Sequence, residues 1–132
     1  MRIGVLLMTH RPLAGDLLRI ASEILGGAPP GVEALEVIND TPRETLVADA
    51  LRCIERLDQG NGVLILTDLY GATPANVAVA LLDRHPRLRV LAGVNLPMLL
   101  RALNYADLDL DTVVDKALQG GRDGACACQA RQ

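Results

Sequence analysis

Two hydrophobic patterns alternate along the chain. Nearly unbroken apolar runs at residues 3–8, 63–66 and 88–94 are typical of strands buried on both faces of a parallel sheet. Each run is followed by apolar residues at three- and four-residue spacing, which indicates an amphipathic helix. A further run at 32–37 contains two glutamates, and charged positions of this kind favour a shorter strand at an edge of the sheet.

Turn and capping signals predict where the helices begin. Pro12 fits a helical first turn, where its missing N–H has no partner to lose. The sequence Thr41-Pro42-Arg43-Glu44 predicts a capping box, and Thr73-Pro74 repeats the cap followed by proline. Helices are therefore expected at about residues 12–25, 42–57, 74–83, 97–103 and 110–118. The expected buried faces are Leu13, Leu17, Ile20, Ala21 and Ile24 in the first helix and Leu46, Ala50, Cys53, Ile54 and Leu57 in the second.

Alternating strands and helices predict an α/β fold with a doubly wound, mostly parallel sheet and helices on both faces. Placing the acidic second strand at an edge gives the strand order 2-1-3-4. We interpret residues 1–132 as one domain. Strands one and three are then neighbours, and their connections leave toward opposite faces, which opens a crevice at the carboxyl ends of both strands.

Composition limits the classes of function. Half of the residues are apolar, and the net charge is −3 with no basic run, which argues against nucleic-acid binding. The absence of an apolar stretch of about 20 residues predicts a cytoplasmic protein without direct membrane insertion. Three cysteines fit a reducing compartment, and Cys126 and Cys128 alone are too few ligands for a zinc site. No metal and no cofactor are expected.

The crevice is where we expect chemistry. His10 is predicted in the loop after the first strand, and Asp68 ends the third. A carboxylate that accepts a hydrogen bond from one ring nitrogen directs the other lone pair outward, as a nucleophile requires. Gly71 allows close backbone approach, and the Thr9 and Thr73 hydroxyls can donate to a phosphoryl group near the starts of the first and third helices. Taken singly, His10 also suits a structural role and Asp68 a turn. His85 is interpreted as a structural residue in a surface turn, and Asp16 as a solvated helix residue.

Four segments together resemble one family. Residues 4–10, 66–76, 92–99 and 121–124 are similar, in order and spacing, to enzyme IIA of the mannose/fructose/sorbose family of the bacterial phosphoenolpyruvate-dependent sugar phosphotransferase system. The resemblance implies that His10 accepts a phosphoryl group from phospho-HPr and passes it to a IIB component or a regulatory target. It implies that Asp68 partners His10, with Thr73 and Asn95 among the supporting residues. It also implies a homodimer that exchanges a C-terminal antiparallel strand at about 125–131.

Three alternatives remain open. A phosphoryl donor for a dihydroxyacetone kinase shares the fold and the histidine. A receiver-type regulator phosphorylated on Asp68 needs an acidic pair after the first strand and a lysine on a later strand, whereas the single lysine, Lys116, falls in a predicted helix. A non-catalytic, flavodoxin-like ligand-binding or regulatory module is the third. Nucleotide binding has little support, because no glycine-rich phosphate loop follows the first strand.

Overall fold

A computed structural model describes residues 2–131. The elements, in chain order, are β1 (Gly4–His10), α1 (Leu13–Leu25), β2 (Val32–Val37), α2 (Arg43–Leu57), β3 (Val63–Thr67), α3 (Thr73–Ala80), a 3₁₀ turn η1 (Leu81–Arg84), β4 (Leu88–Ala92), α4 (Leu96–Asn104) and α5 (Leu110–Asp123). The predicted alternation of strands and helices is confirmed.

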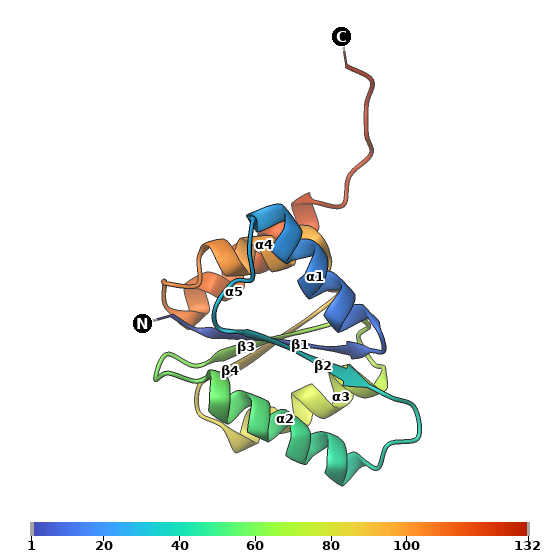
Figure 1. Cartoon of the computed structure of the whole chain (residues 1–132), viewed down its shortest axis with the longest axis vertical. Coiled ribbons are helices and arrows are strands. Elements are labelled where there is room, and N and C mark those ends of the chain that lie inside the picture. Colours follow the sequence, from blue (N-terminus) through green and yellow to red (C-terminus); the bar gives the residue numbers. More distant parts are fainter. Residues whose placement is uncertain (1, 132) are drawn as a thin grey trace.

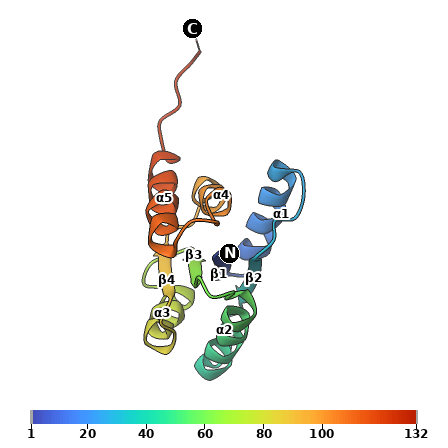
Figure 2. The same ribbon diagram turned by 90° about the vertical axis from the view of Figure 1, so that its left-hand side faces the viewer.

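The four strands form one parallel sheet in the order β2-β1-β3-β4, as predicted. Helices α1, α4 and α5 cover one face, and α2 and α3 cover the other (Figures 1 and 2). The arrowheads of β1 and β2 in Figure 1 point to the same edge, so the loops that follow the strands gather there. The depression at this carboxyl edge is lined by residues that end or follow β1 and β2, so a crevice between β1 and β3 stays a prediction.

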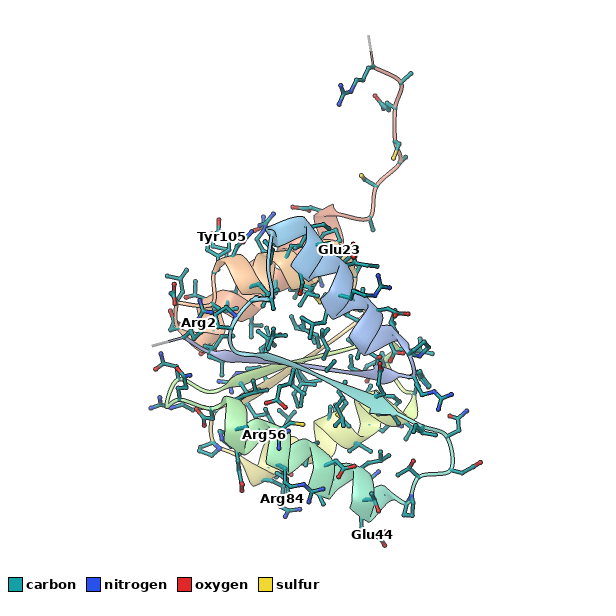
Figure 3. The ribbon with its side chains drawn as sticks, in the orientation of Figure 1. Arg2, Glu23, Glu44, Arg56, Arg84 and Tyr105 are labelled. Carbon is teal, nitrogen blue, oxygen red and sulfur yellow. The ribbon has the colours of Figure 1, made fainter. Side chains whose placement is uncertain are left out.

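Strand β1 divides the core into two layers because its side chains alternate between the faces of the sheet. Val5 and Leu7 pack in the cluster with α1, α4 and α5, whereas Leu6 and Met8 pack with α2 and α3. His10 has the same parity as Leu6 and Met8, so its ring belongs to the α2 and α3 side. Figure 3 shows side chains filling both layers, with Glu23 and Glu44 at the periphery.

The buried face of α1 differs from the prediction. Ala14, Leu17 and Ala21 are buried, whereas Leu13 and Ile24 are exposed. The small alanine side chains let the helix lie close to the sheet, and this turns the larger apolar residues outward. The predicted face of α2 is confirmed in full, including the buried thiol of Cys53.

The predicted caps of α2 and α3 are wrong. Pro42 and Ala72 are the residues that precede the two helices, and neither helix has a side-chain cap. The Thr41 hydroxyl donates instead to the carbonyl of Ile38 at 2.8 Å, which stabilises the turn before α2. Thr73 is the first residue of α3 and is exposed.

The end of the chain also departs from the prediction. Helix α5 continues past Leu118 to Asp123, because two buried glycines let it pack closely against α4: a Cβ at Gly120 would lie 2.9 Å from the Cβ of Arg101. Residues 125–131 form no strand within the single chain and project away from the body (Figure 1). The exchanged strand therefore stays a prediction. Within the described part of the chain, no helix has the length and apolar character of a membrane span.

Candidate active site

The centre of the site is a hydrogen bond between the last residue of β1 and the residue after β3. His10 Nδ1 lies 2.7 Å from Asp68 Oδ2, and the backbone N–H of His10 donates to the same oxygen at 3.1 Å. Parallel pairing of β1 with β3 brings both residues to one edge. The predicted pairing of this imidazole with this carboxylate is present. The prediction that His10 lies in the loop is wrong by one position, since His10 ends β1.

Asp68 is held from both sides. Its Oδ1 accepts the backbone N–H of Leu69 at 3.0 Å, while Oδ2 accepts the two bonds from His10. Partial burial by itself would raise the pKa of the Asp68 carboxyl, but the hydrogen bonds from the His10 ring and backbone outweigh it and lower that pKa below its ordinary value. The Asp68 side chain is 15% exposed, so it is a largely shielded carboxylate that holds the Nδ1 edge of the ring.

The second nitrogen of the imidazole, Nε2, belongs to a partly exposed side chain. With Nδ1 bonded to Asp68, the favoured tautomer has its proton on Nδ1 and a lone pair on Nε2. No hydrogen bond to Nε2 occurs among residues 2–131, and the His10 side chain is 42% exposed. The ring borders a depression of about 290 Å³ that is also lined by Arg11, Val37, Ile38 and Asn39. An oriented, accessible lone pair is what nucleophilic attack requires.

The start of α1 is occupied by Glu36, a residue whose function the sequence analysis missed. Its two carboxylate oxygens accept the backbone N–H groups of Ala14 and Gly15 at 3.2 and 3.0 Å. We interpreted Glu36 only as an edge-strand charge, and no local motif marks it as a cap because it lies 22 residues from Ala14. The hypothesis that the start of α1 holds a phosphoryl group is therefore wrong: a carboxylate already fills that position.

The loop from Asp68 to α3 lies on the other side of the ring. Gly71 has φ +87°, a left-handed conformation that favours glycine, and no atom lies within 4 Å of the position a Cβ would take. Thr73 is exposed at the first position of α3. Helix α3 covers the same face of the sheet to which the His10 ring belongs. Of the residues predicted to support a phosphoryl group, Gly71 and Thr73 are therefore the two that stay candidates on that face.

Thr9 and Asn95 have other partners. The Thr9 side chain is fully buried, and its hydroxyl donates to the carbonyl of His10 at 2.9 Å, so it supports the strand end rather than a ligand. Asn95 caps α4 by accepting the Met98 N–H at 2.9 Å, and its amide nitrogen donates to the carbonyl of Gly121 at 3.0 Å. The Asn95 amide oxygen therefore caps α4 and the amide nitrogen joins α4 to α5, and a phosphate contact for Asn95 stays a prediction.

A second histidine–aspartate pair lies at the opposite edge of the sheet and differs in one respect. His85 Nε2 lies 2.8 Å from Asp58 Oδ2, and His85 Nδ1 accepts the backbone N–H of Arg87 at 3.1 Å. Both ring nitrogens are engaged, so this imidazole joins two loops and presents no free lone pair. Among the described residues, no group of histidine, cysteine and acidic side chains has the arrangement of a metal site.

Comparison with known proteins gives consistent matches. Residues 4–118 match the family model EIIA-man, described as "PTS system fructose IIA component". The mannose-specific EIIAB component of Escherichia coli K12 is 34% identical over 133 residues, which cover 99% of this chain. The chain spans 41% of the length of that relative. The fructose-specific EIIA component of Bacillus subtilis is 29% identical over 107 residues, covering 80% of this chain and 71% of the relative.

A solved structure has the same fold. The mannose/sorbose-specific IIA subunit of Enterococcus faecalis matches with a TM-score of 0.88 and 26% identity, covering 100% of this chain and 98% of that subunit. Because the match covers the whole of this chain, the two proteins share the α/β fold described above.

Proposed function

The chain belongs to the EIIA-man family of phosphotransferase-system components, and from this we propose that it carries a phosphoryl group on His10 between two proteins. The proposed donor is phospho-HPr, and the proposed acceptor is a IIB component or a regulatory target. The single observation that carries the proposal is the half-exposed His10 ring, bonded through Nδ1 to Asp68, with no hydrogen bond to Nε2 among residues 2–131.

Transfer to this protein forms one bond and breaks one. The Nε2 lone pair attacks the phosphorus atom of the donor phosphohistidine, and the P–N bond of the donor breaks with its electron pair returning to the donor nitrogen. The His10 ring gains positive charge as the new bond forms, and the Asp68 carboxylate 2.7 Å from Nδ1 offsets that charge. In the next step, a nucleophile of the acceptor attacks the phosphorus atom from the side opposite to Nε2. The P–Nε2 bond then breaks, and its electron pair returns to His10. Positioning and electrostatic stabilisation are sufficient for transfer of this kind.

The phosphoryl oxygens have a place on one side of the ring. We assign them to the loop before α3, where Gly71 leaves the backbone open and Thr73 presents its hydroxyl at the first helical position. The early N–H groups of a helix attract anions, and no side chain caps α3. Glu36 excludes the start of α1 from the same role.

An apolar surface around His10 supports a protein partner rather than a small molecule. Ile38, Leu69 and Tyr70 come from the two loops beside the imidazole, and their exposed fractions are 51%, 62% and 85%. Exposed apolar groups that border a reactive side chain are typical of an interface core. The depression beside His10 is shallow and lined by few residues, which suits docking of a second protein surface better than enclosure of a sugar.

Homodimer formation is part of the proposal. Residues 125–131 leave the body as an extended segment, and β4 is an edge strand with no neighbour on its outer side within the described chain. An edge strand of this kind presents unpaired backbone groups that a segment from a second copy can satisfy. Sedimentation equilibrium of the full chain beside a chain that ends at residue 124 tests this pairing, and a full chain that stays monomeric at high micromolar concentration would contradict it.

The proposed phosphoryl transfer is tested with His10→Ala and a matched control, His85→Ala. Incubation with phosphoenolpyruvate, enzyme I and HPr is expected to add one phosphoryl group to the wild type and to His85→Ala, and none to His10→Ala, measured by intact mass. Acid-labile, alkali-stable phosphate is expected, because the bond is to nitrogen. Uptake of label by His10→Ala would refute the assignment of His10.

The acceptor is tested in a second step. Phosphorylated protein is separated from the donor and mixed with a mannose-type IIB component or with a dihydroxyacetone kinase. Loss of phosphate to the IIB component supports the proposal, and loss to the kinase alone would replace it with the kinase-donor function. A phosphoprotein that transfers to neither would contradict both acceptors.

A further inference from the structure

We infer, given the proposed function, that the guanidinium of Arg11 binds the oxygens of the phosphoryl group carried by His10. The observation behind this inference is the place of Arg11 directly after the imidazole, on the rim of the depression that both residues line.

The backbone of Arg11 is fixed while its side chain is exposed. The Arg11 N–H donates to the carbonyl of Val37 at 3.1 Å, which continues the pairing of β1 with β2 by one residue. Arg11 lines the same depression of about 290 Å³ as His10 and Asn39. A long, flexible side chain on a fixed backbone position can reach a group attached to the neighbouring ring without moving the strand.

Arg11 is one of several arginines among residues 2–131 whose guanidinium pairs with no carboxylate. Arg19, Arg56 and Arg89 each lie within ion-pair distance of a carboxylate, whereas no carboxylate pairs with Arg11 among residues 2–131. Among the residues that line the depression, Arg11 alone carries a permanent charge. A phosphoryl group on Nε2 would therefore lie beside a depression whose lining contains this one permanent cation.

The charges already present at the site explain why a cation is useful there. Asp68 is an ionised carboxylate bonded to His10, and Glu36, which pairs with Thr9 across β1 and β2, occupies the start of α1. A phosphoryl group adds about two further negative charges. Guanidinium groups match phosphate geometry with two parallel N–H bonds, which makes arginine suitable for offsetting that charge.

The experiment compares Arg11→Gln and Arg11→Lys with the wild type and with Arg89→Gln. Arg89→Gln makes the same change in net charge near the amino end of β4, on the edge of the sheet opposite to Arg11. The Arg89 side chain is also exposed. The initial rate of phosphorylation by phospho-HPr is measured at low and high salt. We expect Arg11→Gln to lower the rate about threefold to tenfold at low salt, with a weaker salt dependence, and Arg11→Lys to recover part of it.

A second measurement separates contact with the phosphoryl group from a general effect on docking. Phosphorus NMR of the purified phosphoproteins follows the ratio of the monoanionic to the dianionic phosphoryl group as pH is changed. A nearby cation favours the dianion, so Arg11→Gln is expected to raise that ratio about threefold at a given pH near 6. Arg89→Gln is expected to match the wild type in both measurements.

The outcomes distinguish the two levels of the proposal. A wild type that accepts no phosphate refutes the proposed function itself. A phosphorylated wild type with an Arg11→Gln protein that matches Arg89→Gln in rate and in titration refutes the role of Arg11 alone. A slower Arg11→Gln protein with an unchanged phosphorus titration places Arg11 in partner docking, and this also overturns the inference.

Discussion

Replacing Asp68 with asparagine removes the charge beside His10 while retaining the shape of the side chain. The carboxylate oxygen Oδ2 accepts two N–H groups from His10, so the amide oxygen of asparagine must take that position. The amide nitrogen then faces the backbone N–H of Leu69, which loses the bond it makes to Oδ1 at 3.0 Å. The substitution therefore weakens the bond to Nδ1 and breaks a second one.

The expected magnitudes follow from these contacts. A hydrogen bond to a charged group contributes about 1.5–3 kcal/mol, compared with about 0.5–1.5 kcal/mol for a neutral one. The loss of about 1–2 kcal/mol at the ring corresponds to phosphoryl transfer that is roughly 5- to 30-fold slower. Loss of the Leu69 bond is expected to lower the free energy of unfolding by about 1–2 kcal/mol, which leaves the protein folded.

The matched control is Asp58→Asn. Asp58 accepts two backbone N–H groups, from Gly60 and Gly62, and lies 2.8 Å from His85 Nε2, so the same change is made in a similar environment at the opposite edge. The initial rate of phosphorylation by phospho-HPr is measured beside urea unfolding for both variants. A comparable loss of stability is expected in both, with slower transfer in Asp68→Asn alone.

Two results would refute this reasoning. If folded Asp68→Asn accepts phosphate at the wild-type rate, the carboxylate does not assist the imidazole. If Asp58→Asn is slowed as much as Asp68→Asn, the effect comes from lost stability and not from the charge beside His10.

Two further substitutions test the structure around the site. Glu36→Ala leaves the N–H groups of Ala14 and Gly15 without their carboxylate, and urea unfolding is expected to show a loss of about 1–2 kcal/mol; a stability equal to the wild type would contradict the cap. Gly4→Ala places a Cβ 2.6 Å from the Cβ of Leu57 and is expected to lower the free energy of unfolding by about 1–3 kcal/mol. Gly27→Ala, where no atom lies within 4 Å of the new Cβ, serves as the control. Equal melting temperatures for the two variants would contradict the close packing of β1 against the end of α2.

Much of the fold could be predicted because periodicity reports burial. The continuous apolar strands, the acidic edge strand and the order 2-1-3-4 follow from patterns within short windows and from the handedness of βαβ connections. The pairing of His10 with Asp68 follows from the same order, since it makes β1 and β3 neighbours. The exchange of residues 125–131 in a homodimer stays a prediction, because a single chain does not contain the second copy.

Other features depended on contacts between segments far apart in the sequence. Helix α5 continues through Gly120 and Gly121 because α4 lies against it, although glycine in isolation favours the end of a helix. The extension of α5 was decided by a partner that no window of neighbouring residues contains. The Thr41 capping box fails for a local reason, because the Thr41 hydroxyl bonds to the carbonyl of Ile38, three residues earlier.

The sequence by itself determined which residues lie close to the carboxyl ends of the strands, and therefore that an imidazole and a carboxylate meet at one edge. Only the tertiary structure decided which anion position remains open there. Glu36 reaches across from β2 to fill the start of α1, while the start of α3 has no side-chain cap on the side of His10. The physical reason is that hydrogen bonds to helix termini form by proximity in space, and that proximity exists only after β2 has paired with β1.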